Sequence, residues 1–408
     1  MLIVGAGPAG LAAAIELRRL GVHRVLVADR EPAAGGVPRH CAHTGYGLRD
    51  LRRVMTGPAY ARHYARLARQ AGAEVLTGTT VTGWDDPGEV TMTSAAGVAT
   101  VGARAVLLAT GCRERPRSAR LVPGTRPPGV MTTGELQQRV YLHGQDMPGR
   151  ALVVGAEHVS YSAMVTLAHA GARVVALVTD EPRPQSYAAF RVGAAVRWRV
   201  PVWTSTAVTG LSGRDRLTGA ELTDLRTGAA RTVACDTIVF TGDWIPDHEL
   251  TRLAGLDIDP GSRGPAVDTA LTTSGPGVYA AGNLVHPAET ADVAALSGRH
   301  AARQIAAVLG RGRPVTGSGH QVVPVQVEAP LAWISPSVIR DPGTPPPRGR
   351  FVLRSTEFRP HARLAVSQDG RTLATARLSL RPARSLTLPA AWLPEVSPSA
   401  GPVRVRVV

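Results

Sequence analysis

The first ten residues, Met1-Leu-Ile-Val-Gly-Ala-Gly-Pro-Ala-Gly10, determine the fold predicted for the start of this 408-residue chain. The apolar residues before Gly5 predict a short strand, which runs directly into a glycine-rich turn of the form GxGxxG. A helix is predicted from about Pro8 to Leu20, and a second strand from Val25 to Ala28. A strand, a glycine turn, a helix and a strand in this order are typical of a unit that binds a dinucleotide.

The glycine turn has the chemistry that a pyrophosphate requires. Its glycines allow a tight turn and let backbone N–H groups approach the ligand, and the start of the following helix stabilises negative charge. Asp29, at the end of the second strand, can accept a hydrogen bond from a ribose hydroxyl. A glycine turn without a ligand is the alternative. The residues predicted to bind the cofactor in this unit are Gly5, Gly7, Pro8, Ala9, Gly10, Asp29 and Arg30.

Later segments of the chain favour FAD over NAD as this cofactor. Gly35-Gly36 follows Asp29 at the spacing with which flavoproteins pass the chain under the pyrophosphate, and Leu107-Leu-Ala-Thr-Gly111 is an apolar strand that runs into Thr-Gly. The segment Thr272-Thr-Ser-Gly-Pro-Gly-Val-Tyr-Ala-Ala-Gly-Asn283 would bring its last two residues to the ribityl and phosphate end of a flavin. A helix from about Asp292 would direct its positive end toward the isoalloxazine. The residues predicted to contact FAD beyond the first turn are Gly35, Gly36, Val81, Ala109, Thr110, Gly111, Gly282 and Asn283.

These motifs, in this order, resemble the flavoprotein oxidoreductases with two dinucleotide-binding domains, the pyridine nucleotide-disulfide oxidoreductase superfamily. The resemblance covers about residues 1–310 and implies an α/β fold with two Rossmann-like, three-layer domains of the FAD/NAD(P) type, with FAD as cofactor. Short segments of period two between Phe351 and Val408 predict a small C-terminal β domain, expected to be antiparallel. The predicted domains are residues 1–112 with 243–312 for FAD, residues 113–242 for a NAD(P)-binding-like domain, and residues 318–408 for the β domain.

The sequence is also similar to a narrower branch of this superfamily. The segments Gly36-Val-Pro-Arg-His-Cys-Ala-His-Thr-Gly-Tyr-Gly47, Thr56-Gly-Pro-Ala-Tyr60 and Gly111-Cys-Arg-Glu-Arg-Pro116 carry this resemblance. The branch includes flavoproteins associated with anaerobic glycerol 3-phosphate breakdown, and it is similar to subunits of opine oxidase and hydrogen cyanide synthase. The resemblance therefore implies a small-molecule substrate, and a partner redox subunit or a homodimer.

A second strand–turn–helix–strand unit begins at Ala151 and departs from the family pattern. Its turn reads Gly155-Ala-Glu-His-Val-Ser160, where the family has GxGxxG or GxGxxA. Glu157 replaces the glycine that lets the backbone approach a pyrophosphate, and it adds a negative charge facing two phosphates. Gly155 and Glu157 are candidate residues of a NAD(P)H site. A retained domain that binds no NAD(P)H is an equal alternative, so this cofactor stays open.

The three cysteines, Cys41, Cys112 and Cys235, predict no disulfide framework, no iron–sulfur cluster and no metal site. Disulfide reductases of the superfamily carry two cysteines just after the paired glycines. Only Cys41 lies there in this chain, so disulfide reduction is disfavoured. Cys41 and His43 are the candidate catalytic residues, because the neighbouring imidazoles and arginines would favour a thiolate. Alternatively, Cys41 is a small buried core residue and His43 a loop residue.

The composition excludes several classes of function. All 46 lysine-or-arginine positions are arginine and the formal net charge is +15, so no Schiff-base lysine or P-loop lysine exists. Arginines beside the cofactor motifs indicate an anionic ligand or a phosphate-rich cofactor, although codon composition accounts for much of the bias. Nucleic acid is not expected as a partner, because aromatic residues make up only 4% and no nucleic-acid module is present. Neither a membrane span nor a secretory signal is predicted, so a cytoplasmic location is expected.

Three functional hypotheses follow from these patterns. The leading one is a FAD-dependent oxidoreductase acting on a small polar or anionic substrate, with NAD(P)H as an open electron partner. An alternative is a FAD electron-transfer subunit that works with a separate dehydrogenase or oxidase, which the altered turn at Glu157 favours. The third is a flavin-binding protein without catalytic activity.

Overall fold

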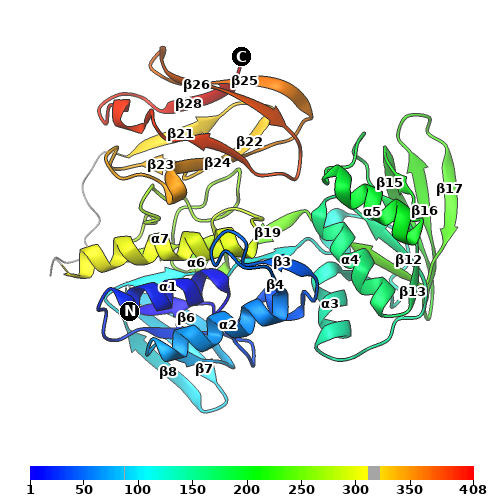
Figure 1. Ribbon diagram of the computed structural model, residues 1–408, viewed down its shortest axis with the longest axis horizontal. Helices are drawn as coiled ribbons and strands as arrows, with labels where there is room; N and C mark the ends of the chain where they lie inside the picture. Colours follow the sequence, from blue (N-terminus) through cyan, green and yellow to red (C-terminus); the bar gives the residue numbers. More distant parts are fainter. Residues whose placement is uncertain (87, 311–321) are drawn as a thin grey trace. The chain divides into compact units, whose positions relative to one another are not determined.

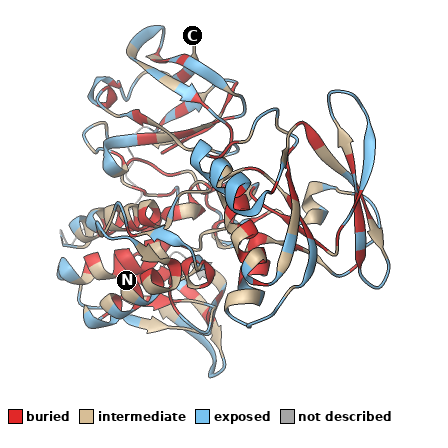
Figure 2. Ribbon diagram, turned by 45° about the vertical axis from the view of Figure 1, so that its right-hand side comes forward, coloured by how far each residue is buried: buried red, intermediate tan, exposed pale blue. Residues whose placement is uncertain are grey.

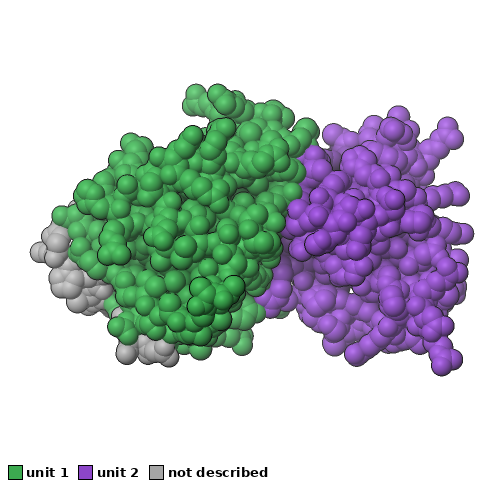
Figure 3. Space-filling model, turned by 90° about the horizontal axis from the view of Figure 1, so that it is seen from below, with its two compact units in different colours: residues 1–39, 44–112, 246–408 green, residues 40–43, 113–245 purple. Residues whose placement is uncertain are grey.

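A computed structural model describes residues 1–86, 88–310 and 322–408 of the chain. The chain forms two compact units (Figure 3): unit 1 comprises residues 1–39, 44–112 and 246–408, and unit 2 comprises residues 40–43 and 113–245. The division into three domains stays a prediction, and its boundaries at residues 312 and 318 lie outside the described residues.

The first half of unit 1 is built on a parallel sheet of order β20-β9-β1-β2-β5. These strands are β1 (Leu2–Val4), β2 (Leu26–Ala28), β5 (Glu74–Leu76), β9 (Val106–Leu108) and β20 (Val278–Ala280). The main helices are α1 (Pro8–Arg19), α2 (Gly57–Gln70), α6 (Glu249–Leu253) and α7 (Ala291–Gly310). The parallel sheet confirms the α/β fold predicted from the first strand–turn–helix–strand pattern.

Helices α1 and α7 lie side by side (Figure 1). The approach is close because Gly298 has no side chain: a Cβ there would lie 2.0 Å from the backbone oxygen of Ala9. A three-stranded antiparallel sheet, β6 (Thr79–Asp86), β7 (Glu89–Ser94) and β8 (Gly97–Gly102), contributes to the same apolar core through Val81, Val90 and Met92. Helices, parallel sheet and antiparallel sheet therefore form three layers. A short ribbon of β3 (Thr44–Tyr46) and β4 (Met55–Thr56) precedes α2.

Unit 2 contains a second parallel sheet, of order β11-β18-β12-β13-β14. Its strands are β11 (Val130–Thr132), β12 (Gly149–Val154), β13 (Ala172–Val178), β14 (Val202–Trp203) and β18 (Thr237–Phe240), and its helices are α3 (Thr133–Tyr141), α4 (His158–His169) and α5 (Ala188–Trp198). An antiparallel sheet of β15 (Thr206–Gly213), β16 (Leu217–Asp224) and β17 (Ala230–Ala234) completes the unit. Two further strands, β10 (Cys112–Glu114) and β19 (Trp244–Pro246), pair with each other.

The last part of unit 1 is a β sandwich of two sheets, of order β23-β21-β28-β25-β26 and β22-β24-β27. Its strands are β21 (Val323–Val327), β22 (Leu331–Ser335), β23 (Val338–Ile339), β24 (Arg350–Ser355), β25 (Arg359–Gln368), β26 (Arg371–Leu380), β27 (Leu386–Pro389) and β28 (Val403–Val407). Buried residues alternate with exposed ones along β21 and β28, and Figure 2 shows both buried and exposed segments in this domain. The expectation of a purely antiparallel domain is wrong at one place, since β21 and β28 pair in parallel. These two strands lie at opposite ends of the domain sequence, so no tight hairpin constrains their direction.

The β sandwich packs on the FAD-type half within unit 1. The guanidinium of Arg340 lies 3.2 Å from the carboxylate of Asp268, and the N–H of Ser337 donates to the backbone oxygen of Val267 at 3.1 Å. Within the described residues, no helix is both long and apolar enough to cross a membrane.

Candidate functional site

In unit 1, the turn after β1 lies at the point where the strand order reverses, since β1 has β2 on one side and β9 on the other. Ligands of open α/β sheets bind in the crevice at this point. A Cβ on Gly5 would lie 2.4 Å from the backbone oxygen of Ala109, and a Cβ on Gly10 would lie 1.9 Å from that of Gly5. A Cβ on Gly7 would meet no atom within 4 Å. Gly5 and Gly10 are therefore needed for backbone packing, whereas Gly7 faces open space.

The start of α1 is suited to bind an anion. Gly7 is its N-cap residue, in extended conformation, and no side chain caps the helix. Pro8 occupies the first turn, where its missing N–H costs nothing. The free N–H groups of such a helix start attract phosphate oxygens.

Asp29 holds this turn in place. Its two carboxylate oxygens accept from the N–H groups of Ala6, at 2.6 Å, and Glu31, at 2.8 Å. Burial raises the pKa of Asp29, and these two hydrogen bonds oppose that rise. A carboxylate has about four acceptor positions, so both oxygens can still accept from a ribose. The neighbouring Arg30 is exposed and lies 3.7 Å from the carboxylate of Asp247.

The other predicted FAD segments meet around the start of α1. A Cβ on Gly36 would lie 2.9 Å from the Cα of Gly7, and one on Gly282 would lie 2.8 Å from the Cβ of Ala9. A Cβ on Gly111 would meet no atom within 4 Å. The hydroxyl of Thr110 donates to the backbone oxygen of Asp247 at 2.8 Å. Distant stretches of the chain thus pack closely around the start of α1, while the positions of Gly7 and Gly111 stay open, and this arrangement fits a dinucleotide such as FAD.

Two predicted cofactor residues are engaged in other contacts. Val81, on β6, is buried in the apolar core of unit 1. The side chain of Asn283 donates to the backbone oxygen of Glu289 at 3.1 Å and accepts from its N–H at 2.8 Å. Asn283 therefore fixes the loop that leads into α7.

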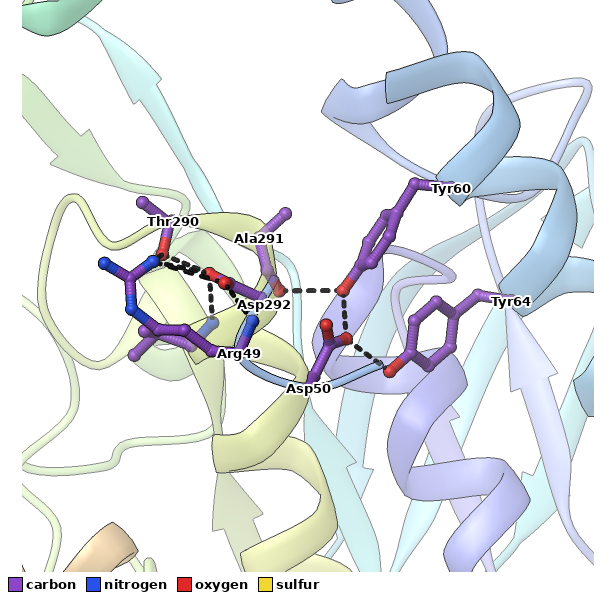
Figure 4. A network of polar contacts seen from close by, with 8 residues as sticks. Arg49, Asp50, Tyr60, Tyr64, Thr290, Ala291 and Asp292 are labelled. Carbon is purple, nitrogen blue, oxygen red and sulfur yellow. Dashed lines mark hydrogen bonds and ion pairs between the residues drawn. The ribbon is translucent and has the colours of Figure 1, made fainter. Parts of the chain in front are cut away.

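A polar network ties the loop after β3 to the start of α7 (Figure 4). The hydroxyls of Tyr60 and Tyr64, one helical turn apart on α2, each lie 2.6 Å from the same carboxylate oxygen of Asp50. Burial raises the pKa of both tyrosines. Arg49 lies 3.2 Å from the carboxylate of Asp292, the second residue of α7. This network was not predicted, although two tyrosines four residues apart on one helix are a visible signal.

A second unpredicted cluster joins the β sandwich to the loop before α7. Arg354, on β24, places its guanidinium carbon 5.3 Å from the ring centre of Trp333, and the imidazole of His286 lies 5.1 Å from the same ring. Arg354 also donates to the hydroxyl of Ser385 at 3.0 Å. Three buried atoms of this cluster lack a hydrogen-bond partner within the described part of the chain: Nδ1 of His286, Oε1 of Glu289 and Nε of Arg354.

The protonation of this cluster is set by burial. Burial lowers the pKa of His286 to about 3, with a smaller contribution from Arg354, so its imidazole is neutral at pH 7. Burial also raises the pKa of Glu289, against the effect of Ser385, Arg354 and other arginines. Buried polar atoms normally have partners, so these three atoms can accept a hydrogen bond from, or donate one to, an ordered water or a polar ligand.

In unit 2, the equivalent crevice lies between β12 and β18, where that strand order reverses. The carboxylate of Glu157 occupies it. One oxygen accepts from the N–H of Ala156 at 2.9 Å, and the other accepts from the hydroxyl of Thr241 at 2.6 Å. A Cβ on Gly155 would lie 2.7 Å from this carboxylate, and one on Gly242 would lie 2.5 Å from it. The carboxylate therefore lies directly over the turn where a pyrophosphate would lie.

A second carboxyl group is buried beside this crevice. Glu114 accepts from the N–H groups of Gly134, at 2.9 Å, and Gly242, at 3.1 Å. Burial raises its pKa to about 7, and the negative charge of Glu157 adds to the rise. Glu114 lies in the quoted segment Gly111–Pro116, but no sequence pattern relates it to these partners, which lie 20 and 128 residues away.

The two predicted catalytic residues belong to unit 2. Cys41 is buried, and its sulfur lies 3.0 Å from the side-chain oxygen of Gln137. His43 is exposed. None of the three cysteines forms a disulfide. A catalytic role for Cys41 and His43 stays a prediction.

Comparison with known proteins identifies the family. The family model described as pyridine nucleotide-disulphide oxidoreductase matches residues 1–298. The alpha chain of sarcosine oxidase from Corynebacterium sp. (strain P-1) is 34% identical over 215 residues, which are 48% of this chain and 21% of that protein. An opine oxidase subunit from Rhizobium meliloti (strain 1021) is 29% identical over 337 residues, which are 76% of this chain and 71% of that protein.

The fold is also that of known reductases. The structure of thioredoxin reductase from Lactococcus lactis superimposes with a TM-score of 0.64 at 17% identity, and the match covers 76% of this chain and 98% of that one. At this identity, the likeness concerns the fold alone. Together with the sequence match over residues 1–298, these findings show that the chain belongs to the pyridine nucleotide-disulphide oxidoreductase family, whose members are FAD-binding oxidoreductases.

Proposed function

We propose that this FAD-dependent oxidoreductase exchanges electrons with a partner redox protein rather than with NAD(P)H. The observation that supports this proposal is the carboxylate of Glu157, which lies in the crevice of unit 2 between the N–H of Ala156 and the hydroxyl of Thr241. A pyridine nucleotide would have to place its pyrophosphate at this position.

Electrostatics oppose such binding strongly. Two like charges 4 Å apart interact with about 4 kcal/mol at an effective dielectric constant near 20, and a pyrophosphate carries two charges. Moving the Glu157 side chain away would also break both of its hydrogen bonds, and a hydrogen bond to a charged group contributes about 1.5–3 kcal/mol. Both costs work against NADH and NADPH alike.

The relatives support a partner protein. The sarcosine oxidase and opine oxidase relatives are named as subunits. An enzyme that receives or passes on electrons through another protein needs no NAD(P)H site of its own. A partner redox protein, or a second copy of this chain, is therefore part of the proposal.

Several residues of this chain would hold FAD or position the segments around it. Bound FAD would supply hydride or single-electron transfer. Gly5, Gly7 and Gly36 would receive its pyrophosphate, and the start of α1 would stabilise the charge. The contact of Arg49 with Asp292 holds the second residue of α7, and the contact of Asn283 with Glu289 holds the loop before this helix.

We further propose a small anionic substrate for this flavin site. Arg354 offers a guanidinium whose Nε has no partner within the described residues, and His286 beside it offers a neutral imidazole. A guanidinium is well suited to bind a carboxylate through paired hydrogen bonds. The β sandwich would thus contribute a substrate-binding residue to the flavin half of unit 1.

The first experiment tests the electron partner. The purified FAD-loaded protein is mixed anaerobically with NADH, with NADPH and with dithionite, and the visible spectrum of the flavin is followed. The proposal predicts bleaching by dithionite only. Rapid bleaching by NADH or NADPH would contradict it. A flavin that dithionite reduces, but that no amine, hydroxy acid or quinone then reduces or reoxidises, would favour the third hypothesis, a non-catalytic flavoprotein.

The second experiment tests the substrate class with acetate as the probe. Acetate is expected to perturb the flavin spectrum of the wild type, and Arg354→Met should weaken its binding about tenfold or more, because the variant lacks the guanidinium. Arg350→Met, an exposed arginine on the same strand, is the matched control and should bind acetate as the wild type does. Equal binding to both variants would refute the role of Arg354.

A further inference from the structure

One face of the β sandwich is lined by arginines. In β25, Leu364 and Val366 point into the core, and so does Val405 in β28. Side chains alternate between the two faces of a strand, so the residues between these point outward. We call the outward set the arginine face; it comprises Arg363, Arg377, Arg404 and Arg406, with Ala365, Ser367 and Thr375 between them.

The register of the strands brings these charges together. Arg363 on β25 is directly opposite Arg377 on β26. Arg406 on β28 is directly opposite Ala365 on β25. Ala365 lies two residues after Arg363 on the same face of β25, so Arg406 and Arg363 are diagonal neighbours. Neighbouring strands lie about 4.8 Å apart, so three guanidinium groups share a small area. Like charges directly opposite each other destabilise a sheet.

Nothing within the described chain relieves this repulsion. The arginines that begin β25 and β26 have acidic partners: Arg359 lies 2.9 Å from Glu357, and Arg371 lies 2.6 Å from Glu395. By contrast, Arg363, Arg377 and Arg406 form no ion pair with any residue that the structure describes. On the arginine face itself, Arg404 lies 3.9 Å from Glu328, so the unneutralised charge within the described chain is that of Arg363, Arg377 and Arg406.

The arginine face is also hollowed beside Arg377, as surfaces that bind another protein can be. A hollow of about 490 Å³ is lined by Arg377, His361, Leu378 and Ser379. The residues between the arginines are small, so the guanidinium groups protrude. Figure 1 shows β25 and β26 on the side of the sandwich away from α7, and both strands carry exposed residues.

We propose that the arginine face docks an acidic surface of a partner protein, whose carboxylates would pair with Arg363, Arg377 and Arg406. Arginine is enriched at protein interfaces, and complementary charge accelerates association. Nucleic acid fits less well, because no Phe, Tyr or Trp side chain lies on this face to stack with bases. A membrane surface fits less well, because the outward residues include no large apolar side chain to insert. This inference names the kind of partner required by the proposed electron transfer and rests on that proposal.

The test uses the whole FAD-loaded protein and a fluorescently labelled poly-L-glutamate peptide as an acidic probe. Fluorescence anisotropy gives the dissociation constant for the wild type and for the double variant Arg363→Gln/Arg377→Gln. The matched control is Arg359→Gln/Arg371→Gln, which removes the same charge from the same two strands. The arginine-face variant should bind at least about tenfold more weakly, and the control within about twofold of the wild type. The Tm of the arginine-face variant should equal or exceed that of the wild type, because repulsion is relieved.

Three outcomes would overturn the proposal. Equal weakening in both double variants would show that the probe senses only total charge. A lower Tm in the arginine-face variant would show that these arginines serve folding. Tighter binding of single-stranded DNA, or of vesicles containing phosphatidylserine, than of poly-L-glutamate would indicate a different partner. The flavin spectrum of each sample is recorded in parallel, so a failure of the flavin site is distinguished from a failure of docking.

Discussion

The two crevices of this protein share one backbone plan and differ in what fills them. In unit 1, Gly7 faces open space, and the N–H of Ala6 is bound by Asp29 from the end of β2. In unit 2, Glu157 stands at the position of Gly7, and its own carboxylate binds the N–H of Ala156. Thr179 follows β13 at the position at which Asp29 follows β2. The hydroxyl of Thr179 accepts from the N–H of Glu181 at 3.3 Å.

Under the proposed function, this difference explains how a nucleotide crevice loses its ligand while the fold is retained. The sheet, the turn and the helix of unit 2 depend on Gly155 and on apolar strands, which are all present. Pyrophosphate binding depends in addition on an empty position over the turn. In unit 2 the carboxylate of Glu157, which accepts from Thr241, lies at that position.

The largest effect is expected from copying the second crevice into the first. Gly7→Glu should fold, because a Cβ at Gly7 meets no atom within 4 Å. It should weaken FAD binding about 100-fold or more, because repulsion of about 3 kcal/mol or more would face the pyrophosphate. The measurement is fluorimetric titration of the apoprotein with FAD.

Gly7→Ala is the control for size alone and should retain most of the bound flavin. Circular dichroism confirms that both variants are folded. A Gly7→Glu protein that is purified with full flavin content would mean that the pyrophosphate does not cross this turn.

A second prediction concerns the buried carboxyl groups of unit 2. Burial raises the pKa of Glu114 from 4.5 to about 7 in the folded protein. The folded state then binds a proton that the unfolded state has already lost. Its contribution to stability is therefore complete below about pH 4.5 and is lost as the pH rises through 7, by up to ~3 kcal/mol.

Urea unfolding at about pH 5 and at about pH 8 measures this loss. Glu114→Gln should make the free energy of unfolding less dependent on pH across this window. Glu135→Gln, a partly exposed residue of α3, should leave the dependence as in the wild type. An unchanged slope in Glu114→Gln would show that Glu114 is ionised in the folded protein throughout this range.

The smallest effect is expected at the residue that holds Glu157. Thr241→Ala removes the hydroxyl that donates to the carboxylate at 2.6 Å, and it should lower the free energy of unfolding by about 1–2 kcal/mol. Thr218→Ala, at an exposed position of β16, should cost less than about 0.5 kcal/mol. Equal costs for the two variants in urea unfolding would mean that Thr241 does not stabilise Glu157.

Local sequence patterns predicted much of the fold. The turns at Gly5 and Gly155 require glycine because of contacts with their own neighbouring strands, so short motifs reveal them. The helices α3 and α5 were not predicted. The apolar side chains of α5 do not form a buried stripe: Phe190 is 46% exposed and Val196 is 77% exposed, so no helical periodicity of buried positions marks this segment.

Only those parts of the candidate site that lie within one short sequence motif were predictable. The role of Glu157 followed from its place in a motif. The contacts of Asp50 with Tyr60 and Tyr64, and of Arg354 with Trp333, join residues that no motif relates. Asn283 was assigned to the cofactor from its motif, but its side chain binds the backbone of Glu289. Contacts between distant segments depend on tertiary packing, which periodicity does not encode.

Exclusion of NAD(P)H by Glu157 is tested most directly by the affinity of the FAD-loaded protein for NADH, measured by isothermal titration calorimetry in the wild type and in Glu157→Gly. We expect no measurable binding of NADH to the wild type. We expect Glu157→Gly to bind NADH at least about tenfold more tightly than the weakest affinity that the calorimeter detects. Wild-type protein that binds NADH as tightly as the variant would contradict this expectation, because the Glu157 carboxylate would then not exclude the nucleotide from the second crevice.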